Sequence, residues 1–234
     1  MEFSKISHVS LTDLFVQQVE GMILSGALAI GERLPPAREL SVKMGVSRPV
    51  ISAGLIELEK LGFVEIIPRQ GAYVCDYRRK GTVETLVAIM RYNGGAMRRN
   101  EVISLLQVRE VLERLCMELV VQNVSREGLQ ALSPLLEAIG EAESPAGCAE
   151  AVFAFHHELA VASGNMLLPL LYHSFRSESI YLWTISCQRT GCGKLYEVKK
   201  RLYASLLCGN REEAGRITRQ SFQDAMGQLT DFVS

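Results

Sequence analysis

Hydrophobic residues in the first third of the chain recur at helical spacing three times and then alternate. The three helical patterns cover residues 11–25, 34–44 and 47–60, and we expect Thr12 to cap the first of them. The alternating pattern predicts a β-hairpin, with strands over 63–67 and 72–74 joined by the turn Pro68-Arg69-Gln70-Gly71. Three helices followed by a hairpin are the order of a winged helix-turn-helix.

A short turn separates the second and third helical patterns. In Met44-Gly45-Val46-Ser47, Gly45 can adopt a positive φ angle, and Val46 can bury its side chain between the helices. Ser47 is expected to cap the third helix. The second helix opens at Leu34-Pro35-Pro36-Ala37, because proline is tolerated in a first turn.

From Thr82 onward the hydrophobic pattern is helical throughout, and no strand pattern interrupts it. The expected helices cover residues 82–92, 101–123, 129–142, 149–162, 166–187, 194–208 and 211–232. Pro134 must kink its helix or restart it after Ser133. The polar run at residues 76–81 is the expected linker, so residues 1–77 form a winged domain and residues 78–234 a helical domain.

The composition describes a folded protein, with 48% hydrophobic and 22% charged residues. No apolar stretch is long enough to span a bilayer, and the first residues lack the features of a signal peptide. We therefore expect a cytoplasmic protein with no membrane partner.

The six cysteines show no zinc-ligand spacing. Cys187 and Cys192 could form a redox pair, but we favour the alternative that they are reduced cysteines on apolar helix faces.

The net charge of −1 neither supports nor excludes a nucleic-acid partner, because binding depends on where the positive groups lie. In a winged helix-turn-helix the third helix enters the major groove by its N-terminal end. Arg48 lies there, and its guanidinium can donate two hydrogen bonds to a guanine edge. Ser47 and Pro49 flank it, and the free N–H groups of the helix favour phosphate. The other candidate DNA-binding residues are Arg33, Arg38, Lys43, Arg69, Gln70 and Gly71.

Each of these arginines, taken alone, is more often a solvated surface residue. Their combination with the helix-turn-helix spacing and the glycine-tipped hairpin favours double-stranded operator DNA as the partner.

Four segments carry a resemblance to the DNA-binding domain of the GntR superfamily. They are Gly31-Glu-Arg-Leu-Pro-Pro-Ala-Arg-Glu-Leu40, Met44-Gly-Val-Ser-Arg48, Leu58-Glu-Lys-Leu-Gly-Phe-Val64 and Arg69-Gln-Gly-Ala-Tyr-Val74. The resemblance implies that Arg38 and Arg48 contact bases in the major groove and that the wing at Gln70 and Gly71 reaches the minor groove. Ser52-Ala53 departs from the arginine–acid pair usual in this superfamily, which implies that a phosphate contact is missing.

Two further segments resemble the C-terminal domain of FadR-type members of the superfamily. They are Val108-Arg-Glu-Val-Leu-Glu113 and Phe155-His-His-Glu-Leu-Ala-Val-Ala-Ser-Gly-Asn165. The resemblance implies an antiparallel helical bundle with a central effector cavity that works as a homodimer. The expected fold class is therefore mainly α, with an N-terminal winged helix-turn-helix and β-hairpin wing and a C-terminal all-α antiparallel bundle.

Many FadR-type domains bind a metal ion through an aspartate and several histidines. The corresponding positions here are Val152, Lys199 and Gln220, so only His156 remains. One histidine does not hold a divalent ion, because three or more protein ligands are normal. We therefore expect no bound metal and no other cofactor.

Loss of the metal ligands moves the chain toward the branch that responds to fatty acyl thioesters. The candidate ligand-binding residues are Arg109, His156, Asn165, Tyr172 and Lys199. Each has a structural alternative: Asn165 as a helix cap, and Tyr172 as part of the core together with Trp183. Arg109 requires an anionic partner inside a bundle, which is a ligand carboxylate unless Glu110 or Glu113 supplies it.

Three functions follow as hypotheses. The first is a transcriptional regulator, a repressor or an activator, controlled by a small effector such as an acyl-CoA or an organic acid. The second is a dimer that binds DNA constitutively, in which the helical domain only dimerises. The third is an enzyme that uses His156, His157 and Glu158, but adjacent residues on one helix point in different directions and cannot converge on one atom. We therefore expect no enzymatic activity.

Overall fold

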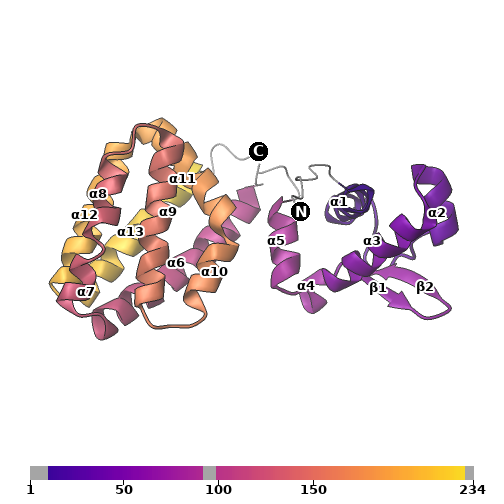
Figure 1. Ribbon diagram of the computed structural model, residues 1–234, viewed down its shortest axis with the longest axis horizontal. Coiled ribbons are helices and arrows are strands. Elements are labelled where there is room, and N and C mark those ends of the chain that lie inside the picture. Colours follow the sequence, from indigo (N-terminus) through magenta and orange to yellow (C-terminus); the bar gives the residue numbers. More distant parts are fainter. Residues whose placement is uncertain (1–9, 92–98, 230–234) are drawn as a thin grey trace, which may run out of the picture. The chain divides into compact units, whose positions relative to one another are not determined.

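The computed structural model describes residues 10–91 and 99–229 (Figure 1). Contacts divide the chain into two compact units, Met1–Gly94 and Gly95–Ser234. The polar run at residues 76–81, expected as a linker, contains the short helix α4 (Tyr77–Lys80). Helix α5 (Val83–Arg91) follows it and belongs to the first unit, because Ala88 and Ile89 pack against the core of that unit. The division therefore lies after α5, later than the boundary expected from the sequence.

The first unit has the predicted order of elements. It contains α1 (Leu11–Leu24), α2 (Ala37–Met44), α3 (Arg48–Lys60), β1 (Val64–Ile67) and β2 (Gly71–Val74). Ser10, and not Thr12, caps α1, because the Ser10 hydroxyl accepts a hydrogen bond from the Asp13 N–H at 3.0 Å. The turn between α2 and α3 forms as expected, with Gly45 in the left-handed region at φ 66°.

The wing is a two-stranded antiparallel hairpin in which Val64 pairs with Val74 and Ile67 with Gly71. The segment before α2 extends it, because the Leu34 N–H donates to the Ala72 carbonyl at 2.8 Å and the Val74 N–H to the Glu32 carbonyl at 2.8 Å. These bonds fix the hairpin to the start of the helix-turn-helix.

Close packing between α1 and α3 positions the third helix. Phe15, Ile51 and Leu58 are buried in the core of this unit. A Cβ atom at Gly54 would lie 2.2 Å from Cδ1 of Phe15, a distance that two non-bonded carbon atoms do not tolerate. Glycine at this position therefore lets the Phe15 ring lie directly on the α3 backbone.

The second unit is entirely helical over residues 99–229. Its helices are α6 (Arg99–Asn123), α7 (Arg126–Gln130), α8 (Ser133–Gly140), α9 (Pro145–Ala162), α10 (Leu168–Ser174), α11 (Arg176–Thr190), α12 (Cys192–Leu207) and α13 (Arg211–Leu229). The restart expected at Pro134 is present, since α8 begins at Ser133. Phe232, the predicted end of the last helix, lies outside the described residues.

One predicted helix is wrong. The sequence favoured a single helix over residues 166–187, but the structure has α10 and α11 with a break at Phe175. The backbone of Phe175 leaves the helical region, with φ −101° and ψ 16°, and its side chain is buried. The break lets the chain bend so that α10 and α11 both pack on α9.

The core of the second unit lies between its long helices. Helix α9 packs beside α11, and α6 packs beside α13 (Figure 1). Phe155 and Leu159 of α9 and Met117 and Val120 of α6 are fully buried in this core. The fold class is therefore as predicted: mainly helical, with an N-terminal helix-turn-helix, a β-hairpin wing and a C-terminal helical bundle. No helix in the described ranges combines the length and apolar character needed to cross a membrane.

Candidate functional site

The N-terminal end of α3 is open to solvent. Ser47, Arg48 and Pro49 are all exposed. Ser47 occupies the N-cap position, but its side chain makes no capping hydrogen bond, so the capping role expected for its hydroxyl is wrong. Both the hydroxyl and the first N–H groups of α3 are therefore available to an anion.

Four arginines of the first unit have no acidic partner among the described residues. They are Arg33, Arg38, Arg48 and Arg69, all exposed and all among the predicted DNA contacts. Five other cations of this unit are ion-paired: Lys43 with Glu39, Lys60 with Glu57, Arg78 and Arg79 with Asp76, and Lys80 with Glu65. The unpaired positive charge therefore collects at the start of α2, the start of α3 and the wing.

The wing tip holds its basic residue in an unusual backbone conformation. Arg69 has a φ angle of 65°, in the left-handed region, and its side chain is exposed together with that of Gln70. The Arg33 side chain lies over Gly71, where an added Cβ atom would meet the Arg33 Nε at 3.1 Å. Arg33 therefore belongs to the surface of the wing. Lys43, the remaining predicted contact, lies in α2, where its Nζ atom is 2.7 Å from Oε1 of Glu39.

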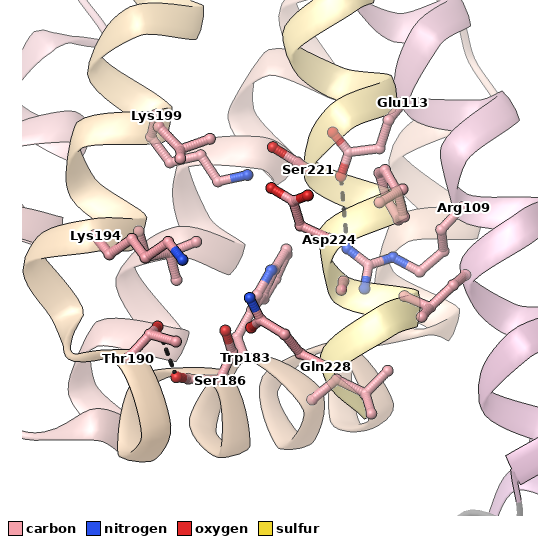
Figure 2. Close-up of a pocket in the computed structure, with 16 residues that line it drawn as sticks. Arg109, Glu113, Trp183, Ser186, Thr190, Lys194, Lys199, Ser221, Asp224 and Gln228 are labelled. Carbon is pink, nitrogen blue, oxygen red and sulfur yellow. Dashed lines mark hydrogen bonds and ion pairs between the residues drawn. The ribbon is translucent and has the colours of Figure 1, made fainter. Parts of the chain in front are cut away.

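The second unit contains a cavity of about 100 Å³ among α6, α11, α12 and α13. Figure 2 shows Arg109 and Glu113 of α6 on one side and Lys194 and Lys199 of α12 on the other. Trp183 of α11 lies between the two sides. The remaining labelled polar residues are Ser186, Thr190, Ser221, Asp224 and Gln228.

Glu113 lies at the centre of a buried cluster beside this cavity, which consists of Arg109, Glu113, His156 and Lys199. One carboxylate oxygen, Oε2, lies 2.7 Å from His156 Nδ1, and the other, Oε1, lies 3.5 Å from Arg109 Nη2. Burial by itself would raise the pKa of Glu113, but His156, Lys199 and Arg109 together lower that pKa to about 2. Glu113 is therefore ionised at neutral pH.

Lys199 is a buried cation whose ammonium group makes no hydrogen bond or ion pair within the described part of the chain. Its exposed fraction is 6%, and Nζ lies 5.9 Å from the centre of the Trp183 ring. Burial lowers the pKa of Lys199 to about 8, although the carboxylate of Glu113 acts in the opposite direction. The group is therefore mostly charged at pH 7.

The buried groups of the cluster have an excess of one positive charge, and the exposed lining residues Lys194 and Asp224 add one formal charge of each sign. Arg109 and Lys199 are cationic and Glu113 is anionic. His156 stays neutral, because burial lowers its pKa and the cations Lys199 and Arg109 lower it further, against the opposing effect of Glu113. Arg109 also lies 4.5 Å over the Trp183 ring, a cation–π contact that holds the guanidinium at the cavity wall.

Comparison with known protein families gives two matches along the chain. Residues 12–74 match the model of the bacterial regulatory proteins of the gntR family, and residues 104–224 match the FCD domain model, which alone covers more than half of the chain. The chain belongs to the GntR family, with an FCD C-terminal domain. This family consists of DNA-binding transcriptional regulators and not of enzymes, and its FCD domain is an effector and dimerisation domain.

Two curated relatives are similar over most of this chain. The HTH-type transcriptional regulator LutR of Bacillus subtilis is 29% identical over 201 residues, covering 82% of this chain and 89% of LutR. The Uxu operon transcriptional regulator of Escherichia coli is 31% identical over 159 residues, covering 66% of this chain and 59% of that protein.

Solved structures share the fold. The structure of Lar, described as controlling the agr system of Listeria monocytogenes, has a TM-score of 0.61 at 14% identity and covers 97% of this chain and 100% of its own. A GntR family regulator from Pseudomonas syringae pv. tomato has a TM-score of 0.51 at 15% identity and covers 95% of this chain and 87% of its own.

The predicted ligand residues of this GntR regulator fall in four different places. Arg109 and Lys199 line the cavity, and His156 lies behind Glu113. Tyr172 lines a smaller void of about 10 Å³, which Arg109 and Trp183 also line.

Asn165 lies outside the cavity and caps α10. Its Oδ1 atom accepts hydrogen bonds from the N–H groups of Leu167 and Leu168 at 2.9 and 3.1 Å. The structural alternative weighed for this residue is thus the one present.

At the positions where the resemblance implied metal ligands, Val152 is buried and apolar, and Gln220 donates to Asp224 at 2.8 Å. Sequence reasoning missed the cavity residues Trp183, Lys194, Ser221, Asp224 and Gln228. It named Glu113 only as a possible partner of Arg109, and Glu113 does supply that ion pair.

Proposed function

We propose that this regulator binds a small carboxylate in the FCD cavity and that the bound acid controls its affinity for operator DNA. The single observation that carries the proposal is the buried excess positive charge formed by Arg109, Lys199 and Glu113. An unpaired buried ammonium is costly, and an anionic ligand would remove that cost.

The size of the cavity supports a small acid over a fatty acyl thioester. Its volume is about 100 Å³, whereas sites for drug-sized ligands occupy roughly 300–1,000 Å³. Trp183, Leu182 and Phe222 provide an apolar wall for the carbon skeleton, and Ser221 and Gln228 can hydrogen-bond to further oxygen atoms.

We infer that this site uses a lysine where the resemblance implied a metal ligand. The ammonium of Lys199 brings its own positive charge to the position, and His156 is engaged with Glu113. A carboxylate can be bound there by Lys199 and Arg109 without a metal ion.

For the DNA-binding domain, we propose that Arg48 and Arg38 contact bases in the major groove and that Ser47 contacts phosphate. Arg33, Arg69, Gln70 and Gly71 form the wing contact, with Pro49 beside Arg48 and Lys43 as a peripheral phosphate contact. The support is that the four arginines have no acidic partner within residues 10–91 and 99–229, since a free guanidinium needs no ion pair to be broken before it binds DNA.

We also propose that the protein is a homodimer formed through α6. Val108, Val111 and Leu115 are 51%, 59% and 40% exposed, and their spacing places them on one face of the helix. Two copies of this stripe would pack against each other and bury it. The bound acid would then shift the balance between dimer forms that place the two recognition helices differently on DNA.

The test is a thermal-shift and calorimetric screen of the full-length protein. The panel contains small mono-, di- and hydroxycarboxylates and acyl-CoAs, measured on wild type, Lys199→Gln and the control Lys200→Gln. Lys200 is the exposed neighbour of Lys199 on the same helix. We expect at least one small acid to raise the melting temperature in a concentration-dependent manner.

The variants decide whether the cavity is the site. Loss of one hydrogen bond to a charged group costs about 1.5–3 kcal/mol, so Lys199→Gln should bind the acid roughly 10- to 150-fold more weakly, and Lys200→Gln normally. Binding of the acid to Lys199→Gln with unchanged affinity would contradict the proposal. If no member of the panel binds, the constitutive dimer becomes the better account.

A further inference from the structure

Three cysteines that are far apart in the sequence meet in the second unit. Cys148 lies in α9, Cys187 in α11, and Cys192 is the first residue of α12. Their sulfur atoms all lie within 4.8 Å of one another. Cys148 and Cys187 are buried and Cys192 is half-buried, so the cluster is closed on the inside and reachable from one side.

The dimensions of this cysteine triad suit a single ion. The centre of an equilateral triangle with sides of 4.8 Å lies about 2.8 Å from each corner, about 0.5 Å more than a zinc–thiolate bond of ~2.3 Å. Small rotations of the three side chains would therefore bring every sulfur into bonding distance of an ion at the centre.

The surroundings of the triad are apolar and uncharged. Cys148 and Cys187 belong to the main hydrophobic core, and Cys192 packs against it. Within residues 99–229 no histidine or carboxylate joins the three sulfurs, and the Ser144 carbonyl lies 4.0 Å from the Cys192 sulfur. Burial raises the pKa of Cys187 to about 11 and raises that of Cys148 further, so without an ion these thiols stay protonated and are poor nucleophiles.

We propose that Cys148, Cys187 and Cys192 form a three-thiolate site for a soft, thiophilic ion and that trivalent arsenic is the class of ion that fits it. Thiolates select soft ions. Three thiolates carry three negative charges, and a buried apolar site favours the ion that cancels all of them. Arsenic(III) does so, whereas zinc or cadmium would leave a net negative charge in the core.

The reaction balances without an oxidant or a reductant. One molecule of arsenous acid, As(OH)₃, reacts with three thiols: three As–S bonds form, three As–O bonds break, and the three thiol protons leave in three water molecules. Arsenic stays trivalent throughout. The product joins α9, α11 and the start of α12 covalently, and this proposal does not depend on the carboxylate site.

The experiment is native mass spectrometry of reduced full-length protein with sodium arsenite. We expect one adduct whose mass gain equals one arsenic atom less three hydrogen atoms, which itself shows that three thiols have reacted. Cys192→Ser should lower the affinity by more than the 10- to 100-fold that loss of a supporting contact costs at a metal site.

Two cysteines outside the triad provide matched controls. Cys208→Ser changes an exposed thiol and Cys116→Ser a buried one, and both should keep the adduct. Cys148→Ser and Cys187→Ser should abolish it, and helical circular dichroism checks that they fold. If either unfolds, the half-buried Cys192 still decides.

Several results would overturn the proposal. They are the absence of an adduct, a mass gain of one arsenic and one oxygen atom less one hydrogen atom, which would mean that only two thiols react and one As–OH bond remains, or an adduct that Cys192→Ser forms with unchanged affinity. A protein that fails to bind arsenite but loses two hydrogens on mild oxidation would be a disulfide pair, which also overturns it.

Discussion

Replacing Lys199 with methionine should stabilise the protein when no ligand is present. Methionine keeps the unbranched stem of lysine and removes the charge that is buried without an ion pair. Buried ionic groups can often be exchanged for hydrophobic residues of similar volume without loss of stability, and with a gain of 1–4 kcal/mol in some proteins.

The size of the effect follows from the pKa of Lys199. Lowering that pKa from 10.5 to about 8 corresponds to about 3 kcal/mol at ~1.36 kcal/mol per pH unit. Below pH 8 the lysine is protonated in both the folded and the unfolded protein, so the full cost is present. Between about pH 8 and 10.5 the unfolded protein binds more protons, so the wild type gains stability as the pH rises.

The assay is urea denaturation of wild type and Lys199→Met at pH 7 and pH 9.5, with Lys200→Met as the control. Lys199→Met should be more stable than wild type by up to about 3 kcal/mol at pH 7, and the difference should fall to about half at pH 9.5. The exposed control should stay within about 0.5 kcal/mol of wild type at both pH values. The same variant should lose carboxylate binding.

A Lys199→Met protein that is less stable than wild type at pH 7 would refute this reasoning. So would a gain in stability that does not change between the two pH values, because the gain would then come from packing and not from the charge. Other groups that titrate near pH 9.5 are common to both proteins and cancel in the difference.

Three further changes test other parts of the account. Gly54→Ala should destabilise the first unit by about 1–3 kcal/mol, because its Cβ atom would lie 2.2 Å from Phe15 Cδ1. Thermal melting measures this loss of stability, with the exposed Ser52→Ala as the control. A loss no larger than that of the control would contradict the close packing of α1 on α3. Asn165→Ala should cost about 1 kcal/mol of stability, because it removes the hydrogen bonds to the start of α10. It should leave the affinity for the carboxylate unchanged. Weaker binding of the carboxylate in calorimetry would show that Asn165 belongs to the ligand site. Val111→Glu should convert the dimer to a monomer, which light scattering measures. The control Val161→Glu, at an exposed position on α9, should remain a dimer. A Val111→Glu protein that remains a dimer would show that α6 is not the interface.

Local signals were sufficient to predict the helix-turn-helix and its wing. Gly45 marks the turn between α2 and α3, and hydrophobic residues alternate on both sides of the turn Pro68-Arg69-Gln70-Gly71. The positions of the arginines on the predicted DNA-binding surface follow directly from these elements. The order of the later helices was also predictable, since Pro134 and Gly209 mark breaks that the structure contains.

Features that depend on packing were not predictable. No glycine or proline marks the break at Phe175, a residue that is buried in the folded chain. The sequence pattern indicated Thr12 as the cap of α1, and only the hydrogen bond from the Asp13 N–H identifies Ser10 in its place. Trp183 and Asp224 reach the cavity from α11 and α13, and this convergence, like that of the three cysteines, requires the tertiary fold.

We expect the start of α3 to bind operator DNA and a carboxylate in the FCD domain to control this binding. The most direct measurement is fluorescence anisotropy with DNA from upstream of the protein's own gene and with random DNA, at two salt concentrations, with and without the acid found in the screen. It compares wild type with Arg48→Ala and with Lys60→Ala, an exposed and ion-paired residue at the other end of the same helix.

Wild type should bind one upstream segment in a salt-dependent manner, and the acid should alter its affinity for that segment. Arg48→Ala should lose about 1–3 kcal/mol of preference for that segment, while Lys60→Ala keeps it. Equal sequence preference in wild type and Arg48→Ala, or operator affinity that is the same with and without the bound acid, would contradict this expectation.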